Sequence, residues 1–279
     1  MDLQLTDKLC LVTASTGGIG RATAAMLAKC GAVVIVNGRS DKSITSAIKS
    51  IQESVGESAR VIPAVGDLSS ADGVTAFLEV IQKIETDYGP VNVVVNNLGI
   101  FHSQAFEEIS DEKWSEYYET NTMSGVRLSR YFLPKMLERN TFGRIIFISS
   151  ESALKPLPNM IAYAVSKTSQ LSLSRGLAEL TKGSKNITVN AILPGPTMTK
   201  GVEDYMKSWV EENGYGDDIA AASAKYFEMH EPTSLVQRFL DPREVAYATT
   251  FLCSPLASGV NGTAQHVDGG IVGTYLNFS

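Results

Sequence analysis

Tyr163 and Lys167 are the residues whose types and spacing point most directly to proton transfer. They lie four residues apart in a segment with helical character, so their side chains share one helix face. A free tyrosine has a pKa of about 10. It exchanges a proton near neutral pH only when its phenolate is stabilised, as an ammonium group one turn away would do. Because exposed pairs with this spacing are common, the pair needs support from the rest of a site.

Ser150 and Asn121 are candidates to complete such a site. Ser150 follows the apolar run Arg144–Ser149 and precedes Tyr163 by 13 residues. A hydroxyl there can donate a hydrogen bond to a substrate carbonyl and hold it for hydride attack. Asn121 falls inside a predicted helix, although Asn is a modest helix former. We interpret it as the holder of an ordered water that links the lysine to solvent, with a solvated or back-bonded side chain as the alternative.

A glycine-rich segment near the N-terminus predicts a nucleotide site. It reads Thr13-Ala14-Ser15-Thr16-Gly17-Gly18-Ile19-Gly20, between an apolar run and a helical segment. Glycines let the backbone turn tightly and approach a pyrophosphate, and the helix N-terminus offers free N–H groups and its positive dipole end. Any tight strand-to-helix turn needs glycine, but the position in the first βα unit of the chain favours nucleotide binding.

Arg39 decides which cofactor we expect. A fold that prefers NAD carries an acidic residue roughly 20 positions after the glycines, where it binds the ribose 2′-hydroxyl. This chain has Gly38-Arg39-Ser40 there, and an arginine can form a charge-assisted fork with a 2′-phosphate and stack on adenine. NADP(H) is therefore favoured over NAD(H), although Asp41 lies close by and a surface arginine without a ligand is the simpler alternative.

The elements that must position these residues alternate between strand-like and helix-like segments. Ile44, Ile48 and Ile51 recur with helical spacing, and residues 112–139 and 161–182 read as two longer helices. Between the helical segments lie seven short apolar runs of the kind that form strands buried on both faces. They are Lys8–Thr13, Ala32–Asn37, Arg60–Val65, Val91–Asn96, Arg144–Ser149, Asn186–Leu193 and Thr263–Val267.

This alternation predicts an α/β fold, a Rossmann-type doubly wound seven-stranded parallel sheet in three αβα layers, forming a single domain over residues 1–279. Ligands bind such a sheet beyond the carboxyl ends of its strands, which is where the candidate residues fall. The segment Lys200–Leu240 lacks a strand signal and is long for a connection. We expect it to form one or two helices that make a substrate lid, with a loosely packed surface excursion as the alternative.

Composition narrows the classes of function. Apolar residues make up 44% and charged residues 19%, which allows a full core and argues against disorder. With a net charge of −6, the chain lacks the basic footprint of a nucleic-acid-binding protein. Cys10, Cys30 and Cys253 have neither metal-ligand nor redox spacing, so we expect no metal. The sequence shows neither a signal-peptide pattern nor an apolar stretch of roughly 20 residues. We therefore expect a soluble, cytoplasmic protein without a membrane partner.

Together these residues resemble the short-chain dehydrogenase/reductase family over nearly the whole chain. Thr13–Gly20 is similar to the family's Thr-Gly-x-x-x-Gly-x-Gly motif, with Ala14 in place of its first glycine. Asp67-Leu68 looks like the pair that borders adenine. Asn96–Gly99 is similar to the family's Asn-Asn-Ala-Gly motif, with Leu98 in place of the alanine. Each motif alone has low specificity, but a match to several motifs in the family's order along the chain has a very low probability of arising by chance.

The resemblance extends to the second half of the chain and implies roles for individual residues. Pro194–Thr199 looks like the segment that meets the nicotinamide carboxamide, and Val267–Gly270 matches the family's common C-terminal ending. By resemblance the active-site tetrad is Asn121, Ser150, Tyr163 and Lys167. The implied cofactor contacts are Ala14, Ser15, Thr16, Gly18, Ile19, Gly20, Arg39, Asp67, Leu68, Asn97, Gly99, Tyr163, Lys167, Pro194, Thr197 and Thr199. The family also implies a homotetramer or homodimer packed through the helices near 112–139 and 161–182.

The expected function is therefore NADP-dependent hydride transfer between nicotinamide and a small-molecule carbonyl or alcohol, similar to a ketone or 3-oxoacyl reductase, with Tyr163 as general acid/base. An NAD-linked polyol or sugar-acid dehydrogenase is the alternative enzyme. A non-catalytic nucleotide-binding sensor or scaffold is the competing class, disfavoured because the tetrad is complete. The motifs do not name the substrate.

Two features near the expected pocket bear weakly on the substrate. The lid segment is rich in aromatic residues, which mildly favours a ketone with an apolar part: Tyr205, Trp209, Tyr215, Tyr226 and Phe227. Glu151 and Lys155 lie near the mouth of the pocket, where they could meet a charged substrate. We expect them to be solvated instead.

Overall fold

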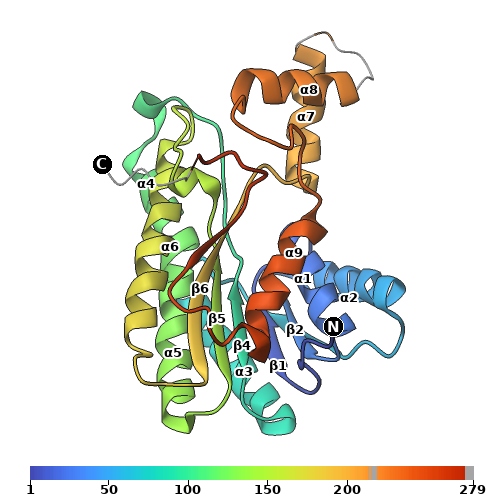
Figure 1. The fold of residues 1–279 in the computed structure, drawn as a ribbon, viewed down its shortest axis with the longest axis vertical. Coiled ribbons are helices and arrows are strands. Elements are labelled where there is room, and N and C mark those ends of the chain that lie inside the picture. The colour runs from blue at the N-terminus through green and yellow to red at the C-terminus, as the bar shows by residue number, and fades with distance from the viewer. Residues whose placement is uncertain (213, 215–218, 274–279) are drawn as a thin grey trace.

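Seven parallel strands form the centre of the computed structural model, which describes residues 1–212, 214 and 219–273 (Figure 1). Their order is β3-β2-β1-β4-β5-β6-β7, and every neighbouring pair is parallel. The chain therefore winds from the middle of the sheet to one edge and then to the other, which confirms the doubly wound prediction. The strands are β1 (Leu9–Val12), β2 (Val33–Gly38), β3 (Val61–Val65), β4 (Val93–Asn96), β5 (Gly143–Ile148), β6 (Ile187–Pro194) and β7 (Ala264–Val267).

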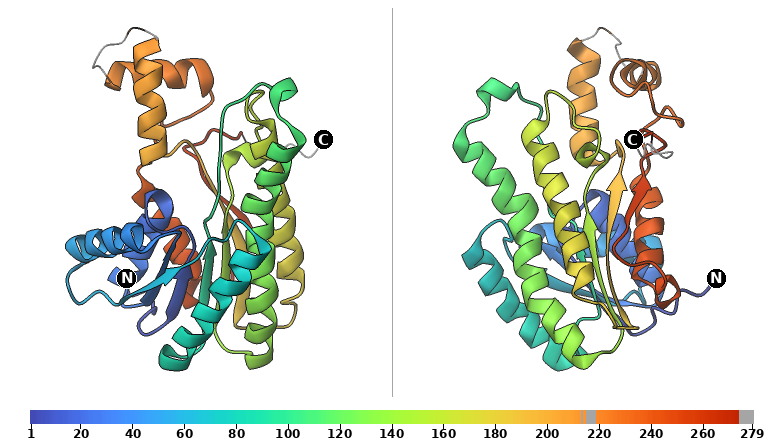
Figure 2. Two further views of the ribbon diagram at one scale, coloured as in Figure 1. Left: turned by 180° about the vertical axis from the view of Figure 1, so that it is seen from behind. Right: turned by 60° about the vertical axis from the view of Figure 1, so that its left-hand side comes forward.

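Helices cover both faces of the sheet and complete three layers (Figures 1 and 2). One face carries α1 (Gly18–Lys29), α2 (Asp41–Val55) and α9 (Pro242–Cys253), and the other carries α3 (Ala71–Tyr88), α5 (Ser124–Arg139) and α6 (Ile161–Glu179). Because successive side chains of a strand point to opposite faces, Leu9 and Leu11 enter one core while Cys10 and Val12 enter the other. Burial on both faces explains why the five inner strands read as largely apolar runs, whereas the edge strands β3 and β7 are more exposed.

Local chemistry accounts for two departures from regular structure. Pro63 lies inside β3, where it removes a ladder donor, and this is tolerated because β3 is an edge strand. The long helix expected over 112–139 is divided: α4 (Asp111–Tyr117) passes into a π-helical turn, η2 (Tyr118–Met123), before α5. Such turns insert an extra residue into a helix and are frequent at functional sites. Within the described part of the chain, no helix is long and apolar enough to cross a bilayer.

The segment 200–240 forms two helices beyond the carboxyl end of β6, α7 (Lys200–Glu212) and α8 (Ile219–His230), which project away from the sheet (Figures 1 and 2). A parallel bridge between Thr197 and Leu240 closes its base, and Met198 N donates to Leu240 O at 2.8 Å. The prediction of one or two helices is thus confirmed for the described residues. We call residues 200–240 the lid segment.

The lid segment has a small core of its own. Phe227 is fully buried, Trp209 is buried with it, and Tyr226 stacks on Phe239 with 5.3 Å between ring centroids. A pair of helices that projects from the main body must bury an apolar face against itself, and these aromatic residues do so. Trp209, Tyr226 and Phe227 therefore serve this core, whereas Tyr205 is 43% exposed. Tyr215 lies outside the described residues.

Candidate active site

Three local structures bring the predicted tetrad together beyond the carboxyl end of β5. Ser150 follows β5 as the N-cap of a short 3-10 helix, η3 (Glu151–Ala153). Tyr163 and Lys167 lie on α6, which packs against η3 and against η2, the turn that carries Asn121. Phe101 contacts the ring of Tyr163 edge-on, with 6.2 Å between centroids, and adds an aromatic wall.

Lys167 is buried and held by two acceptors. Its Nζ donates to the main-chain oxygen of Ile148 at 2.8 Å and to Oε1 of Gln170 at 3.3 Å. Burial lowers the pKa of Lys167 to about 7, and the nearby Glu151 carboxylate opposes that change. The amine is therefore poised between its charged and neutral forms near neutrality.

Tyr163 keeps its proton in this environment. Burial raises the pKa of Tyr163 well above its ordinary value, Glu151 raises it further, and a hydrogen bond with Ser150 lowers it. The Nζ of Lys167 lies 5.7 Å from the centroid of the tyrosine ring. We expected Lys167 to lower the pKa of Tyr163, but burial outweighs that effect. Removing the phenolate from water costs more free energy than its attraction to a partly charged amine at this distance supplies.

Asn121 is fully buried, and all of its polar atoms have protein partners. Its Oδ1 accepts from Ile100 N at 2.8 Å, and its Nδ2 donates to Ile100 O at 3.0 Å and to Ser166 Oγ at 2.9 Å. Its main-chain oxygen accepts a hydrogen bond from Nε2 of Gln170. The π turn thus aims Asn121 at the chain after β4, which accounts for an asparagine inside a helix.

Glu151 is a buried member of this site. Only 9% of its surface is exposed, and its Oε2 accepts a hydrogen bond from Ser150 Oγ at 2.7 Å. Burial raises the pKa of Glu151 to about 7; the hydrogen bond from Ser150 lowers it, and Glu231 raises it further. The solvated position predicted for Glu151 is wrong, because η3 packs against α6 and holds this side chain inside.

Lys155 ties the loop after η3 to the lid segment. Its Nζ lies 2.7 Å from Oε2 of Glu231 and also donates to Thr233 Oγ1 at 3.2 Å. The Glu231 side chain is only 2% exposed, whereas that of Lys155 is 30% exposed. Lys155 is therefore an anchor with partial access to solvent, and not the free surface residue that we expected.

The turn between β1 and α1 has the shape of a phosphate cradle. Ala14 (φ 48°) and Gly18 (φ 52°) both adopt the left-handed conformation, which costs an L residue about 1–2 kcal/mol. A Cβ on Gly18 would lie 3.1 Å from Cγ2 of Thr199, so glycine keeps a gap there. Gly17 caps α1 without a side-chain hydrogen bond, which leaves the first N–H groups of the helix for an anion. Thr16 is half-buried between them. These features fit the pyrophosphate of a dinucleotide.

Asn37, at the end of β2, supports this turn from behind. Its Oδ1 accepts from Ala14 N at 3.0 Å, and its Nδ2 donates to Ala64 O at 3.2 Å. Its own N–H donates to Ser15 Oγ at 3.0 Å, while Ser15 Oγ donates to Val12 O at 2.7 Å. The Ser15 hydroxyl is therefore committed to the shape of the turn, and only its neighbours face a ligand freely.

Arg39 and Asp67 share the edge where the adenosine end of a dinucleotide is expected. Arg39 is exposed directly after β2. The pKa of Asp67 is lowered mainly by hydrogen bonds from Ser69, and to a smaller extent by the charge of Arg39. Leu68 points into the core, where it is 2% exposed. Arg39 is thus available to a 2′-phosphate, while Leu68 anchors the chain after β3.

The chain after β4 joins the nucleotide turn to the tetrad. Asn97 N donates to Thr13 Oγ1 at 2.8 Å, and Asn97 Nδ2 donates to Thr13 O at 3.0 Å. Leu98 packs against the core, which accommodates the larger residue that replaces the alanine of the motif. A Cβ on Gly99 would lie 3.2 Å from Nζ of Lys167, so the absence of a side chain lets the backbone pass close to the tetrad.

The segment after β6 lies over the same turn. Pro194 ends β6, and the buried Thr197 donates from Oγ1 to Gly195 O at 2.8 Å. Thr199 borders the glycine turn through the contact described above. Ile19 packs partly into the core below, and a Cβ on Gly20 would lie 2.5 Å from Nδ2 of Asn97. All of the predicted cofactor contacts therefore gather along one edge of the sheet.

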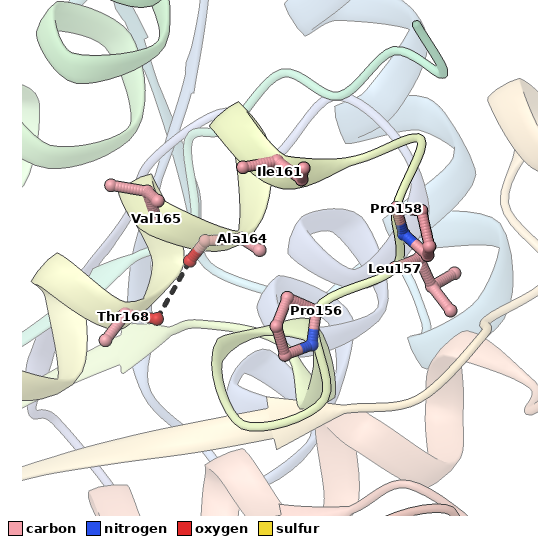
Figure 3. A pocket seen from close by; sticks show the side chains of 7 residues that line it. All are labelled: Pro156, Leu157, Pro158, Ile161, Ala164, Val165 and Thr168. Carbon is pink, nitrogen blue, oxygen red and sulfur yellow. Dashed lines mark hydrogen bonds between the residues drawn. The ribbon is translucent and has the colours of Figure 1, made fainter. Parts of the chain in front are cut away.

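Two surface hollows are lined by none of the tetrad residues. One, of about 800 Å³, runs from the glycine turn across α1, α2 and α9 to the start of α7. The other, of about 470 Å³, is an apolar depression on the outer side of α6 (Figure 3). Its lining residues are Pro156, Leu157, Pro158, Ile161, Ala164, Val165 and Thr168. Within this depression, Thr168 Oγ1 donates to Ala164 O at 3.0 Å, so the Thr168 hydroxyl has a hydrogen-bond partner in the chain itself.

Fold and site together define a class of protein, a nucleotide-binding oxidoreductase with a Tyr–Lys pair. The family model described as enoyl-(acyl carrier protein) reductase matches residues 13–272. The chain is 48% identical to the uncharacterized oxidoreductase YvrD of Bacillus subtilis (strain 168), over 98% of this chain and 99% of that protein. The chain therefore belongs to the short-chain dehydrogenase/reductase family and is an oxidoreductase that acts on CH–OH or carbonyl groups.

Two relatives of named activity differ in their substrates. The 3-oxoacyl-(acyl-carrier-protein) reductase FabG of Chlamydia muridarum (strain MoPn / Nigg) is 32% identical, over 97% of this chain and 100% of that protein. The crystal structure of L-sorbose reductase from Gluconobacter frateurii, complexed with NADPH and L-sorbose, has a TM-score of 0.88 and 32% identity. That match covers 99% of this chain and 100% of that chain.

Three residues of the site were not singled out from the sequence as members of it. Glu151 immediately follows Ser150, but a 3-10 turn has no periodicity that reveals which way its side chains point. Gln170 stands three residues after Lys167 on α6, so it shares the face of the tetrad, and this spacing was the available signal. Asn37 is a polar residue at the end of an apolar run. Within the described residues, no group of three or more His, Cys, Asp or Glu side chains could hold a metal ion.

Proposed function

We propose that this protein is an NADP(H)-dependent reductase of a carbonyl substrate, with Tyr163 as the general acid. The observation that carries this proposal is the convergence of Ser150, Tyr163 and Lys167 on the sheet edge that also carries the glycine turn. Burial raises the pKa of Tyr163, so this residue keeps its proton near neutral pH and can give it to a developing alkoxide. Three free cysteines are consistent with a cytoplasmic location.

We propose NADP(H) as the cofactor because Arg39 presents an exposed guanidinium directly after β2. The position after β2 holds Gly38 and Arg39 where an NAD-preferring fold has an acid. Arg39 would pair with the 2′-phosphate, Gly17 and Gly18 would hold the pyrophosphate, and Thr197 and Thr199 would border the nicotinamide. The complex of L-sorbose reductase with NADPH supports the same choice.

The proposed chemistry divides among the residues of the tetrad. A bound nicotinamide supplies the hydride. Tyr163 gives its hydroxyl proton to the substrate oxygen, and Ser150 lies beside that hydroxyl to position the same oxygen. Lys167, fixed by Ile148 and Gln170, stays near enough to Tyr163 to stabilise negative charge when it is protonated. Asn121 fixes the chain after β4 against α6.

A polyhydroxylated ketone is a second candidate substrate beside a simple ketone or 3-oxoacyl chain. Glu151 and the Lys155–Glu231 ion pair place charged groups next to the tetrad, where hydroxyl groups of a substrate would find partners. Trp209, Tyr226 and Phe227 of the lid segment are used in its own core and give no support to an apolar substrate. The likeness to L-sorbose reductase favours this candidate, and the likeness to FabG favours the 3-oxoacyl candidate.

One experiment tests the function and separates the alternatives. The purified protein is incubated with NADPH or NADH and a panel of simple ketones, 3-oxoacyl thioesters and ketoses, and nicotinamide absorbance is followed. We expect oxidation of NADPH with at least one carbonyl class. A strong preference for NADH with activity on polyols would support the NAD-linked dehydrogenase instead. Binding of either cofactor without turnover of any substrate would support a nucleotide sensor or scaffold.

We also propose that two copies of the chain pack through α6, in a homodimer or a homotetramer. The apolar depression of Figure 3, whose lining includes the 48% exposed Val165, leaves an uncovered apolar face on this helix. Light scattering after size-exclusion chromatography tests this proposal. Val165→Asp should shift the protein to a smaller species, and a wild-type monomer would contradict it.

A further inference from the structure

The chain between β4 and α4 presents an aromatic side chain beside Tyr163. The ring of Phe101 lies edge-on to the ring of Tyr163, with 6.2 Å between the centroids and 63° between the ring planes. Phe101 is 45% exposed, so part of its apolar surface is open to a ligand. Single exposed apolar side chains are common on protein surfaces. Exposure alone therefore indicates no role, and the way in which this residue is held becomes decisive.

Hydrogen bonds fix the main chain on both sides of Phe101. Before it, Ile100 N donates to Oδ1 of Asn121 at 2.8 Å, and Ile100 O accepts from Nδ2 of the same side chain at 3.0 Å. After it, His102 N donates to the Tyr117 hydroxyl at 2.9 Å, and that hydroxyl donates to His102 O at 3.4 Å. Both side chains that hold the segment are buried. The main chain therefore cannot carry the ring away from the tetrad.

The tip of the ring lies against the first turn of α7. A Cβ built on Gly201 would meet Cζ of Phe101 at 3.8 Å, which is an ordinary van der Waals contact. In a helix glycine is less favourable than alanine, and the φ of Gly201 is not positive. Neither the backbone nor a clash therefore requires glycine at this position. Its effect is to leave a slot beside the ring.

We propose that Phe101 is a specificity-determining residue, whose ring limits the width of the group that a carbonyl substrate extends toward α7. The proposal rests on the reductase function proposed above. The ring contacts both Tyr163 and α7, so a substrate whose carbonyl oxygen reaches Tyr163 extends one substituent past it. A narrow substituent fits beside a ring that the main chain holds in place, and a wide one is rejected.

Gly201 sets how firmly the ring holds this limit. With its main chain fixed, Phe101 can yield only by rotation of its side chain between rotamers. The slot beside α7 is the room for that rotation. Filling the slot should therefore sharpen the rejection of wide substituents, whereas removing the ring should abolish it.

Pairs of ketones that differ only in width measure the limit. Each pair shares one side of the carbonyl and carries on the other side either an unbranched propyl group or a tert-butyl group. Three pairs cover the proposed carbonyl classes: methyl ketones, hydroxymethyl ketones, which present the end of a ketose, and 3-oxoacyl thioesters. The measured quantity is the width ratio, which is kcat/KM for the propyl member divided by kcat/KM for the tert-butyl member at saturating NADPH.

Phe101→Ala should lower the width ratio by about 10- to 100-fold, because small changes in the size of an apolar pocket discriminate between substrates by that amount. The tert-butyl member should gain kcat/KM, while kcat for the propyl member and NADPH affinity stay close to wild type. Phe101→Leu, with a smaller apolar side chain, should give an intermediate ratio. Damage to Tyr163 would instead lower kcat for both members alike and leave the ratio unchanged.

Gly201→Ala should have the opposite effect. The new Cβ fills the slot without a clash, so the width ratio should rise by about 3-fold or more, the size of a coupling between residues in contact. In the Phe101→Ala background the same change should leave the ratio as it is, because the atom that the new Cβ would meet is gone. Phe106→Ala is the matched control and should not change the ratio. Phe106 is 57% exposed on η1 (Phe106–Glu108), outside the clamped stretch of the same connection.

The outcomes separate this inference from the function on which it rests. A wild-type enzyme that turns over, with a Phe101→Ala variant of unchanged width ratio, would overturn the role of Phe101 and leave the reductase intact. An equal fall in Phe106→Ala would also overturn it, because the limit would then not depend on the clamped ring. Equal effects of Gly201→Ala with and without the Phe101 ring would exclude the slot. A wild-type protein that reduces no member of any pair would instead contradict the proposed reductase.

Discussion

The two ends of the active-site edge are built by different physical means. At the nucleotide end, side-chain oxygens of Asn37 and Thr13 accept hydrogen bonds from the main-chain N–H groups of Ala14 and Asn97 and so fix the glycine turn, and the charged group that would face a ligand, Arg39, is exposed. At the substrate end, Glu151 and Lys167 are both buried, and burial moves the pKa of each to about 7. We therefore expect the proposed nucleotide end to work through shape and the proposed substrate end through desolvated charge. Substitutions at the nucleotide end should change cofactor affinity or the free energy of unfolding, and substitutions at the substrate end should change the rate of the reaction.

The largest expected effect is on the substrate side, in Tyr163→Phe. Removing the hydroxyl removes the proposed general acid, so kcat should fall by about 1,000-fold or more. Affinity for NADPH, measured by fluorescence titration, should stay within about 2-fold because the phenol adds little to nucleotide binding. Turnover close to wild type in this variant would remove Tyr163 from the mechanism.

Sequence periodicity was sufficient for the fold. Each predicted strand overlaps an observed one, because strands buried on both faces must be apolar throughout and the helices between them must be amphipathic. The nucleotide end could be placed for a related reason. A left-handed turn and a close approach of the backbone each require glycine at a particular position. Gly18 has the left-handed conformation, and Gly99 allows the close approach.

Only part of the substrate end could be predicted from the sequence. Tyr163 and Lys167 follow from helical spacing, but burial, and not the lysine, controls the pKa of Tyr163. The inward position of Glu151 depends on how η3 packs against α6, and the bridge made by Gln170 depends on the π turn that carries Asn121. These are tertiary properties, and no local pattern encodes them. The same is true of the lid segment, where Trp209, Tyr226 and Phe227 suggested a ligand surface and instead contribute to a core.

A smaller effect is expected on the nucleotide side, in Arg39→Asp. The change removes the cation that would pair with the 2′-phosphate and introduces a repelling charge, so NADPH affinity should fall by about 10- to 100-fold, or about 1.4–2.8 kcal/mol. Affinity for NADH should hold or improve, and kcat at saturating cofactor should change little. Asp41→Asn is the matched control for charge near this edge. Unchanged NADPH affinity in Arg39→Asp would exclude Arg39 from the cofactor site.

Gly18→Ala tests the shape of the same end without changing any charge. The new Cβ would lie 3.1 Å from Cγ2 of Thr199, at a residue with φ +52°, and the left-handed conformation alone should cost about 1–2 kcal/mol. Chemical denaturation should report that loss, together with weaker NADPH binding. Thr199→Ser in the same chain removes the close carbon and should restore part of the stability but not all of it. Full restoration would mean that crowding alone, and not the backbone conformation, disfavours alanine here.

The smallest expected effect has the opposite sign and lies four residues earlier, in Ala14→Gly. Ala14 has φ 48°, so glycine relieves a left-handed penalty of about 1–2 kcal/mol while the unfolded chain gains freedom worth about 0.5–1 kcal/mol. The net gain in the free energy of unfolding should be about 0.5 kcal/mol, measured by chemical denaturation. Ala22→Gly, inside α1, is the matched control: the same change in a helix should cost about 1 kcal/mol. Equal losses in both variants would show that Ala14 carries no strain. A gain in Ala14→Gly alone would show that the turn keeps a strained alanine at its nucleotide end, where the family motif has glycine.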